Sequence, residues 1–389
     1  MSKKIKIMVA AFALIMFGFT AQAADPVRIG YSIAKTGLFS KAAPSQISAY
    51  ELWAELVNKA GGLNIAGIKR PIKLIWYDDE SNPTKSAQIY EKLITQDKVD
   101  LLIAPWGTPH HLNVAGVVQK YKFPMVGNTA ASVAVRQIKP GNIWFPTPMF
   151  PDKVAAELVK LLQANGVKSA AVISNVLPFS SENRQYLLPA LKKAGIAVKV
   201  NEQYPPDVKD MTTMLTAIKQ AKVDAVIGLA YPADSFLYMG QAKGIGISAP
   251  FQFLLVGPTI DAFGKAFGKF ADGIVTMGHW SPAQKAWPRA KPFFKAYKAK
   301  YKGMNPDYLD TAIAYMSLEI LEQAVAKAGL DKNKLRQVIS SDTFDTINGP
   351  VKFEGIENAI TPVAFLQQQA GQMELIWPKK IATSKFMKR

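Results

Sequence analysis

Apolar, strand-like runs alternate with helix-like segments along most of this chain, and this alternation limits the possible folds more than any other feature. Between residues 27 and 128 the expected strands and helices fall at 27–33, 45–59, 72–79, 85–96, 99–104, 110–121 and 124–128. After Pro151 the alternation restarts, with helices and strands expected at 153–165, 169–175, 182–194, 197–204, 211–221, 224–230, 233–243 and 251–257. Continuous apolar strands separated by helices are typical of parallel sheets covered on both faces. The sequence therefore predicts an α/β protein with two similar lobes.

The length agrees with two lobes. The chain has 389 residues, and at about 150 residues per domain this length favours two domains, each able to bury a core. The chain contains no cysteine, which excludes disulfides, thiol catalysis and cysteine-bound metals. In open parallel sheets, ligands gather where the carboxyl ends of the strands run into the next helices. We therefore expect a functional site in the loops at those strand ends.

The first two dozen residues have the composition of a secretory leader. Lys3, Lys4 and Lys6 form a positive start, and the stretch Ile5–Thr20 is almost entirely apolar. Ala21–Ala23 then supplies the small-x-small pattern that signal peptidase reads. The apolar stretch is shorter than the roughly 20 residues that cross a bilayer as a helix. We expect residues 1–23 to be a signal peptide cleaved after Ala23, so that the mature protein is exported. A retained membrane anchor is the alternative.

The charge of the chain is strongly positive, with a formal net charge of +18. Such a charge suits nucleic acid, an anionic membrane surface or small anions. The lysines are scattered, however, and often occur at helical spacing, as in "FFKAYKAKYKG", which indicates solvated helix faces. No aromatic-and-basic RNA signature, zinc finger or helix-turn-helix pattern occurs. We therefore expect no nucleic-acid partner.

The stretch "DLLIAPWGTPHH", residues 100–111, contains one of these strand-end loops. Trp106–Pro109 form the expected turn between the strand and the next helix, with Thr108 as N-cap and Pro109 at the first helical position. The backbone NH groups of His110 and His111 would then be free at the positive end of the helix. Together with the Thr108 hydroxyl they predict a binding place for a carboxylate or a similar anion. Trp106 is either a core residue or a ring that holds a small ligand.

The two adjacent histidines raise the alternatives of a metal site and a catalytic site. Neighbouring helical residues point about 100° apart, so His110 and His111 are poorly placed to bind one ion. His279 is the third and last histidine, whereas zinc sites usually need three or four ligands at suitable spacing. The sequence has no GxSxG elbow, Walker loop or HExxH motif. We therefore expect no metal and no catalytic residue, and interpret the histidines as polar residues of a first helical turn.

Several longer segments resemble the leucine/isoleucine/valine-binding proteins of bacterial ABC importers. The segments are "VRIGYSIAKTGLFS", "YELWAELVNKAGGLNIAGIKRPIKLIWYDDESNPTKSAQIYEKLI", "PPDVKDMTTMLTAIKQAKVDAVIGLAYPADSFLYMGQAKGIG" and "GPVKFEGIENA". Each is loose by itself, but their order, their spacing and the leader are together specific. The resemblance covers essentially the whole mature chain.

The resemblance implies a type I periplasmic binding protein fold, in which two Rossmann-like lobes are joined by three crossings of the chain. The first lobe would hold residues 24–146 plus 277–348, and the second 147–276 plus 349–389. Candidate hinge segments are "FPTP" at 145–148 and "NGP" at 348–350. The family further implies a periplasmic protein without a cofactor that delivers a small solute to an ABC permease in the inner membrane.

The family's ligand-binding residues can be placed on this sequence one at a time. The loop that carries the carboxylate-binding serine falls on Trp106, Gly107 and Thr108, and Thr108 keeps the hydroxyl. The next strand-end loop falls on "GNTAAS", where Thr129 takes a contact position and Ala131 replaces a family threonine. In the second lobe an aromatic residue that closes over the ligand falls on Phe179, and a strand-end tyrosine falls on Tyr231.

One position departs from the family pattern. The acid that neutralises the ammonium of a bound amino acid would lie just after "VGP", where this chain has Thr259. A buried ammonium without a carboxylate partner costs several kcal/mol. Either another acid reaches the cleft, with Asp234 and Asp261 as candidates, or the solute carries no amino group and is an aromatic or aliphatic acid.

The sequence therefore predicts a periplasmic solute-binding protein that captures a small carboxylate-bearing solute between two lobes and performs no covalent chemistry. Two alternatives remain open. One is a ligand-sensing subunit for a receptor or regulator, because the same fold serves both roles. The other is an exported hydrolase on the same architecture.

Overall fold

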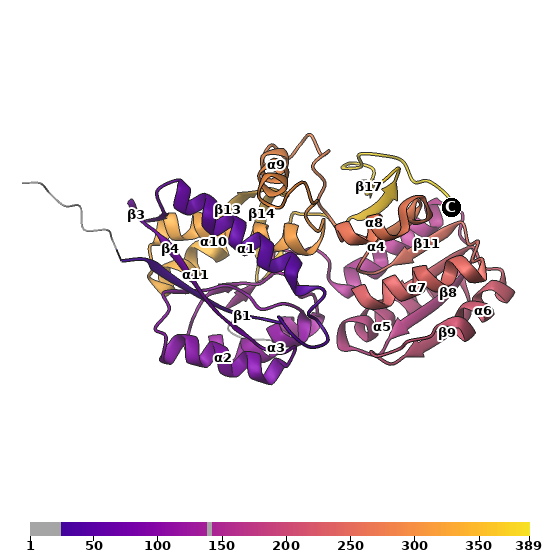
Figure 1. Cartoon of the computed structure of the whole chain (residues 1–389), viewed down its shortest axis with the longest axis horizontal. Coiled ribbons are helices and arrows are strands. Elements are labelled where there is room, and N and C mark those ends of the chain that lie inside the picture. The colour runs from indigo at the N-terminus through magenta and orange to yellow at the C-terminus, as the bar shows by residue number, and fades with distance from the viewer. Residues whose placement is uncertain (1–24, 138–141) are drawn as a thin grey trace, which may run out of the picture.

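A computed structural model describes residues 25–137 and 142–389 as two α/β lobes set side by side along the long axis of the molecule (Figure 1). The expected signal peptide lies outside the described residues. Within them, no helix has the length and apolar character needed to cross a membrane. The predicted alternation of strands and helices is confirmed in both lobes.

The first lobe contains the N-terminal part of the described chain and a later return segment. Its sheets are the parallel β4-β1-β5 group, the parallel β6-β7 pair, the β2-β3 hairpin and the antiparallel β13-β14-β15 group. Helices α2 and α3 pack together on one side of β1, and α1 and α10 on the other (Figure 1). The elements are β1 (Val27–Ile33), α1 (Ala43–Lys59), β2 (Leu63–Ile65), β3 (Ile68–Arg70), β4 (Ile72–Asp78), α2 (Pro83–Thr95), β5 (Leu101–Leu102), α3 (Thr108–Lys120), β6 (Met125–Val126), η1 (Val133–Gln137), β7 (Ile143–Trp144), α9 (Ala290–Lys300), α10 (Asp310–Ala328), α11 (Lys332–Ser341), β13 (Thr343–Thr346), β14 (Gly349–Glu354) and β15 (Glu357–Asn358).

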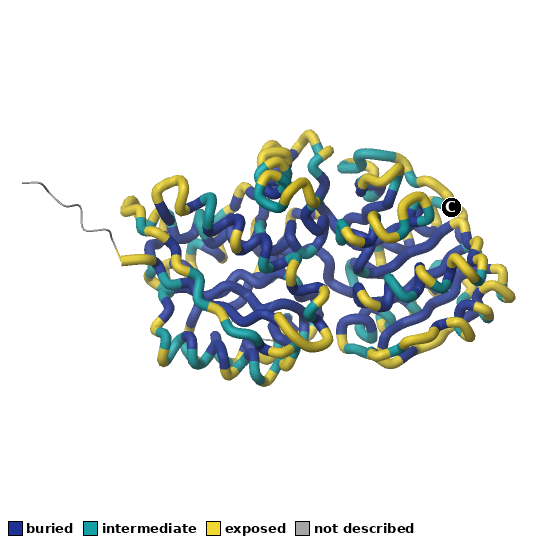
Figure 2. The backbone as a smooth tube through the Cα atoms, viewed as in Figure 1, coloured by how far each residue is buried: buried dark blue, intermediate teal, exposed yellow. Residues whose placement is uncertain are grey.

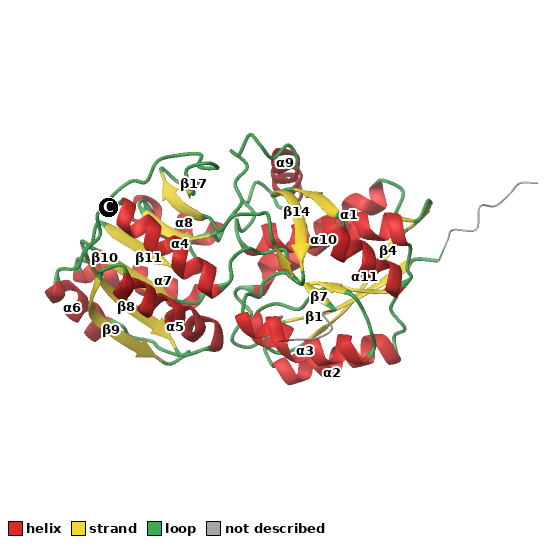
Figure 3. Cartoon of the chain, turned by 180° about the vertical axis from the view of Figure 1, so that it is seen from behind, coloured by secondary structure: helices red, strands yellow, loops and turns green. Residues whose placement is uncertain are grey.

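The second lobe is built on one seven-stranded sheet in the order β17-β16-β12-β11-β10-β8-β9. Strands β8 to β12 are parallel, whereas β16 and β17 add an antiparallel hairpin at one edge. Figure 3 shows this sheet between its helices. The elements are α4 (Pro151–Ala164), β8 (Ser169–Asn175), α5 (Pro178–Lys193), β9 (Ala197–Tyr204), α6 (Thr212–Ala221), β10 (Ala225–Leu229), α7 (Pro232–Ile245), β11 (Phe251–Leu254), α8 (Asp261–Phe267), η2 (Gly268–Ala271), β12 (Ile274–Met277), β16 (Phe365–Gln369) and β17 (Gln372–Trp377).

The cores follow the sequence pattern. Every residue of β8 and β10 is buried, as expected for central strands with helices on both faces. The edge strand β9 instead mixes exposed and buried residues. Figure 2 shows the buried backbone running through the middle of each lobe. Helix starts obey local rules as well: the Asn82 side chain accepts hydrogen bonds from the NH groups of Thr84 and Lys85, with Pro83 at the first helical turn of α2.

The segments that connect the lobes are tied to one another. The Phe145 NH donates to the Ile356 carbonyl (2.7 Å) and the Asn358 NH to the Phe145 carbonyl (3.1 Å). Farther along the crossings, the side chains of His279 and Asn348 are hydrogen-bonded. Strand β14 pairs with β13 and not with the second-lobe sheet. We therefore propose that the last crossing follows Asn358, later than the expected segment at 348–350.

Candidate ligand-binding site

A cavity with about 510 Å³ of empty space lies where the two lobes meet. All the expected ligand-binding residues except Thr259 line it, and they come from both lobes. The lining consists of Trp106, Gly107, Thr108, Asn128, Thr129, Ala130, Ala131, Thr147, Met149, Phe179, Tyr231, Pro232, Val256, Met277, Leu309, Asp310 and Ile313.

The loop between β5 and α3 forms part of the first-lobe wall of the cavity. Helix α3 begins one residue earlier than expected. Gly107, and not Thr108, is the N-cap residue, and its φ of +85° is one that glycine adopts without strain. Thr108 is therefore the first helical residue, and its hydroxyl does not cap the helix. The Thr108 Oγ1 accepts a hydrogen bond from the Ala131 NH (3.3 Å), which leaves the hydroxyl hydrogen to donate elsewhere.

The free NH groups at the start of α3 also differ from the expected pair. The His111 NH donates to the Gly107 carbonyl (3.2 Å), so the prediction that this NH is free was wrong. The first backbone NH groups of a helix have no hydrogen-bond acceptor within the helix. In α3 these NH groups belong to Thr108 and His110, because Pro109 has no NH. A solute carboxylate at this end of α3 would meet these NH groups and the Thr108 hydroxyl.

The two histidine rings serve the first lobe and do not line the cavity. His111 is buried, its Nδ1 lies 2.9 Å from the Gly107 carbonyl, and its Nε2 accepts a hydrogen bond from the Asn128 NH. Burial lowers the pKa of His111 to about 4, so the ring is neutral at pH 7 and donates through Nδ1. His111 thereby links the two loops that line the cavity. Among the described residues, no cluster of three potential metal ligands occurs.

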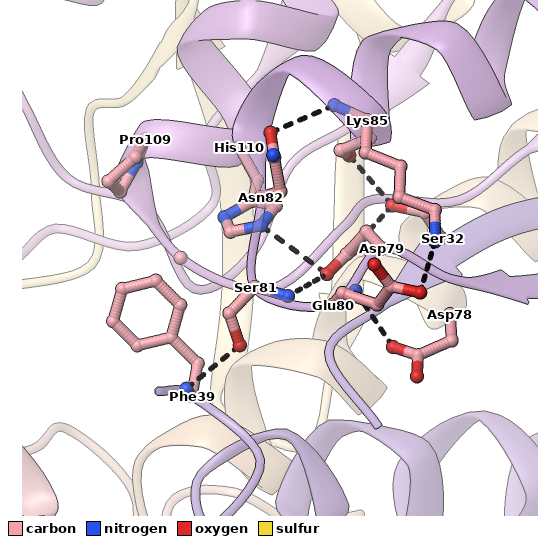
Figure 4. Close-up of polar contacts among 12 residues, drawn as sticks. Ser32, Phe39, Asp78, Asp79, Glu80, Ser81, Asn82, Lys85, Pro109 and His110 are labelled. Atoms are coloured by element: carbon pink, nitrogen blue, oxygen red, sulfur yellow. Dashed lines mark hydrogen bonds and ion pairs between the residues drawn. The ribbon is translucent and has the colours of Figure 1, made fainter. Parts of the chain in front are cut away.

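His110 points toward the loop after β4, as Figure 4 shows. Its Nε2 lies 3.4 Å from Oδ1 of Asp79, and both side chains are fully buried. Asp79 also accepts hydrogen bonds from the Ser32 hydroxyl (2.8 Å) and the Ser81 NH (3.0 Å). The Ser81 hydroxyl in turn accepts the Phe39 NH (3.0 Å). His110 therefore contributes to the packing between the start of α3 and two neighbouring loops.

The second strand-end loop, after β6, is fixed by a buried network of polar side chains. The Thr129 hydroxyl accepts the Gly107 NH (2.9 Å) and lies 3.0 Å from Gln46 Oε1. The Asn128 amide donates to the Tyr50 hydroxyl (2.6 Å), which donates to the Ala104 carbonyl (2.8 Å). Thr129 lines the cavity, but its hydroxyl is already used to hold the neighbouring loop. Sequence reasoning assigned it a ligand contact and missed this role.

The second lobe faces the cavity with aromatic rings. Phe179 lies in the first turn of α5 and Tyr231 is the N-cap residue of α7, and the two ring centroids are 6.3 Å apart in an edge-to-face arrangement. The Tyr231 hydroxyl is buried and makes no close hydrogen bond among the described residues, although the Phe179 backbone acts on its pKa. Phe39 of the first lobe stacks against Tyr231 (5.8 Å) and also contacts Trp106 (5.0 Å). Phe39 was not predicted, because an apolar residue in a loop carries no functional signal.

A carboxyl group, that of Asp310 at the start of α10, also lines the cavity and was not predicted. The Trp106 Nε1 donates a hydrogen bond to Asp310 Oδ2 (2.9 Å). Burial, and then the charge of Asp307, raise the pKa of Asp310 to about 8, although the Trp106 hydrogen bond opposes the shift. Among the residues that line the cavity in the described part of the chain, Asp310 is the only aspartate, glutamate, lysine, arginine or histidine.

Comparison with known proteins agrees with this arrangement. A model of the periplasmic binding protein family matches residues 26–372. The chain belongs to this family. The resemblance to its leucine/isoleucine/valine-binding members is confirmed by a relative from Pseudomonas aeruginosa, the leucine-, isoleucine-, valine-, threonine- and alanine-binding protein. This relative is 23% identical over 366 residues, which cover 91% of this chain and 92% of the relative.

Solved structures of periplasmic binding proteins confirm the type I fold. A branched-chain amino acid transporter substrate-binding protein from Streptococcus pneumoniae, in complex with isoleucine, superimposes with a TM-score of 0.79 at 19% identity, covering 94% of this chain and all of that one. An ABC transporter solute-binding protein from Rhodopseudomonas palustris, in complex with benzoate, also gives 0.79 at 19% identity, covering 90% and 96%. At such low identities these structures show the fold alone.

The acids expected near Thr259 do not line the cavity of this periplasmic binding protein. Asp234 accepts hydrogen bonds from the Asn175 amide (2.9 Å) and the Tyr231 NH (3.0 Å). Asp261 forms an ion pair with Lys265 (2.5 Å). Thr259 itself is buried. Burial raises the pKa of the Asp307 carboxyl, and the hydrogen bond with the Thr259 hydroxyl is among the contacts that oppose this rise. Asp310 is the acid that reaches the cavity.

Proposed function

We propose that this periplasmic binding protein is exported, captures a small carboxylate-bearing solute in the cavity between its lobes, and delivers it to the permease of an ABC importer. The supporting observation is that Thr108 and Trp106 of the first lobe and Phe179 and Tyr231 of the second line one cavity. These residues are far apart in sequence and were selected from sequence alone. The family consists of solute-binding proteins, and we extend its non-enzymatic role to this chain.

In this proposal the carboxylate of the solute accepts hydrogen bonds from the Thr108 hydroxyl and from the free NH groups at the start of α3. The positive end of the helix favours the negative charge. The apolar part of the solute then lies against Trp106, Phe179 and Tyr231. Two related structures hold isoleucine and benzoate, each a carboxylate joined to an apolar group. The proposed solute class has the same two parts.

Capture works as a shift between open and closed arrangements of the lobes. A solute that touches residues of both lobes stabilises the closed arrangement only as far as it binds that arrangement better than the open one. The polar groups of the first lobe would hold the solute first, and the rings of the second lobe would then cover it. No covalent step is needed.

The first experiment identifies the solute. Native mass spectrometry of the mature protein purified from its own host should show a small molecule bound one to one, and its mass gives its composition. A thermal-shift panel of apolar amino acids, aliphatic acids and aromatic acids should then show stabilisation by at least one class. A protein that carries no solute and is stabilised by no carboxylate would contradict the proposal.

The second experiment replaces the hydroxyl that we assign to the carboxylate. Thr108→Val keeps the shape of the side chain but removes the donor, and a hydrogen bond to a charged group contributes about 1.5–3 kcal/mol. We expect the affinity for the solute, measured by isothermal titration calorimetry, to fall by about 10- to 100-fold. The melting temperature of the empty protein should fall only slightly, because the hydrogen bond that the Ala131 NH loses is long at 3.3 Å. Thr84→Val, on the exposed face of α2, is the matched control and should change neither.

Unchanged affinity of Thr108→Val would place the carboxylate elsewhere in the cavity. A large loss of melting temperature in the empty variant would instead show that Thr108 mainly supports the loop after β6 through the Ala131 NH.

A further inference from the structure

The carboxyl group of Asp310 stands out in the cavity because no positive charge accompanies it. Trp106 donates to its Oδ2, and no lysine, arginine or histidine in the described part of the chain forms an ion pair with it. The remaining residues that line the cavity are uncharged. A buried carboxyl without a countercharge is costly and is uncommon outside functional sites.

The neighbouring acid, Asp307, is held in a different way. Its Oδ1 accepts hydrogen bonds from the NH groups of Leu309 (2.9 Å) and Asp310 (3.3 Å), and its Oδ2 accepts one from the Ser45 hydroxyl (3.1 Å). Asp307 does not line the cavity. Burial raises the pKa of Asp307, and these donors oppose that rise, so the Asp307 carboxyl is occupied at the start of α10. Asp310 has one side-chain donor, and its carboxyl remains available to a solute.

We propose that Asp310 binds the ammonium group of the solute while Thr108 and the start of α3 bind its carboxylate, so that the protein selects α-amino acids with apolar side chains over acids that lack the amino group. This inference rests on the proposed function. It assigns the ammonium to an acid of the first lobe, on a different segment from Thr259 and from Asp234 and Asp261. In this proposal Asp310 of α10 supplies the negative charge for the ammonium group that Thr259 cannot supply.

The surroundings of Asp310 fit a partner that arrives with the solute. Asp310 is the first residue of α10, where the helix dipole favours a negative charge. The charge of Asp307 opposes a negative charge on Asp310. Burial, and then the charge of Asp307, raise the pKa of Asp310, so the empty cavity favours its protonated form. An ammonium group would supply the missing positive charge and favour the ionised carboxylate, so that amino-acid binding displaces the proton.

The test compares pairs of solutes that differ only in the amino group, such as L-isoleucine with 3-methylpentanoate and L-phenylalanine with 3-phenylpropanoate. Affinities are measured by calorimetry for the wild-type protein and for Asp310→Asn, which keeps the shape and can still accept from Trp106. Removing one partner of a buried charge pair should weaken amino-acid binding on the order of 100-fold. Binding of the acids should be unchanged or stronger. Asp261→Asn, an acid outside the cavity, is the matched control and should leave both classes unchanged.

A second measurement uses the wild-type protein alone and so does not depend on how well the variant folds. Calorimetric titrations in buffers of different ionisation enthalpy report the protons exchanged on binding. We expect an apolar amino acid to release protons from the cavity on binding, and its partner without the amino group to release none.

The outcomes separate this inference from the proposed function. If acids without the amino group bind as tightly as amino acids, and Asp310→Asn affects neither class, the assignment of Asp310 is wrong but carboxylate capture stands. The same holds if amino acids bind without releasing a proton and tolerate Asp310→Asn. If no member of either class binds, both proposals fail together.

Discussion

The first lobe faces the cavity with hydroxyl, amide and carboxyl groups, whereas the second lobe faces it mainly with the side chains of Phe179, Tyr231, Pro232 and Val256. The polar groups of the first lobe are hydrogen-bonded to one another before any solute arrives. In the second lobe, the one hydroxyl among these four side chains, that of Tyr231, has no partner among the described residues. The lobes therefore differ both in chemistry and in how far their site residues are held in place.

This difference suggests a division of labour. A fixed polar wall can bind the charged ends of a solute with little loss of side-chain freedom, because its hydrogen bonds already hold the groups in position. An apolar wall gains mainly from excluding water, which requires the cavity to close. We infer that the first lobe determines which charged groups are accepted, and that the second lobe determines the size and shape of the apolar part.

The largest effect should come from breaking the network behind the first-lobe wall. Asn128→Ala removes the amide that donates to Tyr50 and the Oδ1 that accepts the Thr129 NH. A buried polar group left without a partner costs about 1–3 kcal/mol. We therefore expect the free energy of unfolding to fall by about that amount, measured by urea denaturation, and solute affinity to fall with it because Gly107 and Thr129 lose their fixed positions.

The control for this variant is Asn165→Ala at the end of α4, which removes a single hydrogen bond to the Leu161 carbonyl in the second lobe. It should lower stability slightly and leave affinity unchanged. If Asn128→Ala lowers stability but leaves affinity unchanged, the first-lobe wall does not need its network for binding, and the proposed contrast between the lobes loses its basis.

In the second lobe we expect a smaller effect, in which affinity falls while the stability of the empty protein does not. Tyr231→Phe removes a hydroxyl that makes no close hydrogen bond among the described residues, so the empty protein should be about as stable as the wild type. If that hydroxyl bonds to the solute, affinity should fall about fivefold, since a typical hydrogen bond contributes about 1 kcal/mol. Calorimetry and thermal melting measure the two quantities separately.

Tyr238→Phe provides the matched comparison within the same helix, α7. Its buried hydroxyl has a partner, Gln252 Oε1, at 2.9 Å, so this variant should lose stability while keeping its affinity. An affinity for Tyr231→Phe equal to that of the wild type would mean that the Tyr231 hydroxyl makes no contact with the solute, which would sharpen the contrast between the lobes.

The sequence predicted some elements of the fold better than others. The alternation of apolar strands and helices placed β1, β8 and β9 with their observed bounds, because continuous apolar runs and their flanking turns are local signals. Helix α5 begins at Pro178 and not near Glu182, so Phe179 lies on a helix where a loop was expected. Beyond residue 257 the sequence indicated only the helical spacing of "FFKAYKAKYKG". The β16–β17 hairpin was not predicted, because it joins the sheet only through long-range pairing.

The site residues show the same limit. Thr108 and Tyr231 were found because each lies at the end of a strand, in a segment that resembles the family. Asp310 carries no such signal: it lies 204 residues from Trp106 along the chain, and only the folded structure brings the two side chains together. The resemblance to the family placed the ammonium-binding acid at Thr259 instead. The Thr259 side chain contacts Asp307 and does not line the cavity. Local patterns thus reveal the loops, but not which distant groups complete the site.

The smallest effect concerns a contact that joins the lobes directly. Glu182 in α5 accepts a hydrogen bond from the NH of Val133 in η1 at 2.8 Å. Because Val133 belongs to the first lobe and Glu182 to the second, the bond exists only when the lobes are close together. Glu182→Ala should therefore weaken solute binding about threefold, since the lost bond is partly exposed and water replaces it.

Glu202→Ala, on the exposed side of β9, removes an acid of the same lobe without touching the first lobe and should leave affinity unchanged. The melting temperature of the empty protein distinguishes two explanations of the Val133 contact. If Glu182→Ala clearly lowers that melting temperature, the Val133 contact is present without a solute, and the lobes are already held together in the empty protein. The first-lobe wall would then not be open to bind the solute first, and the two walls would act on it together.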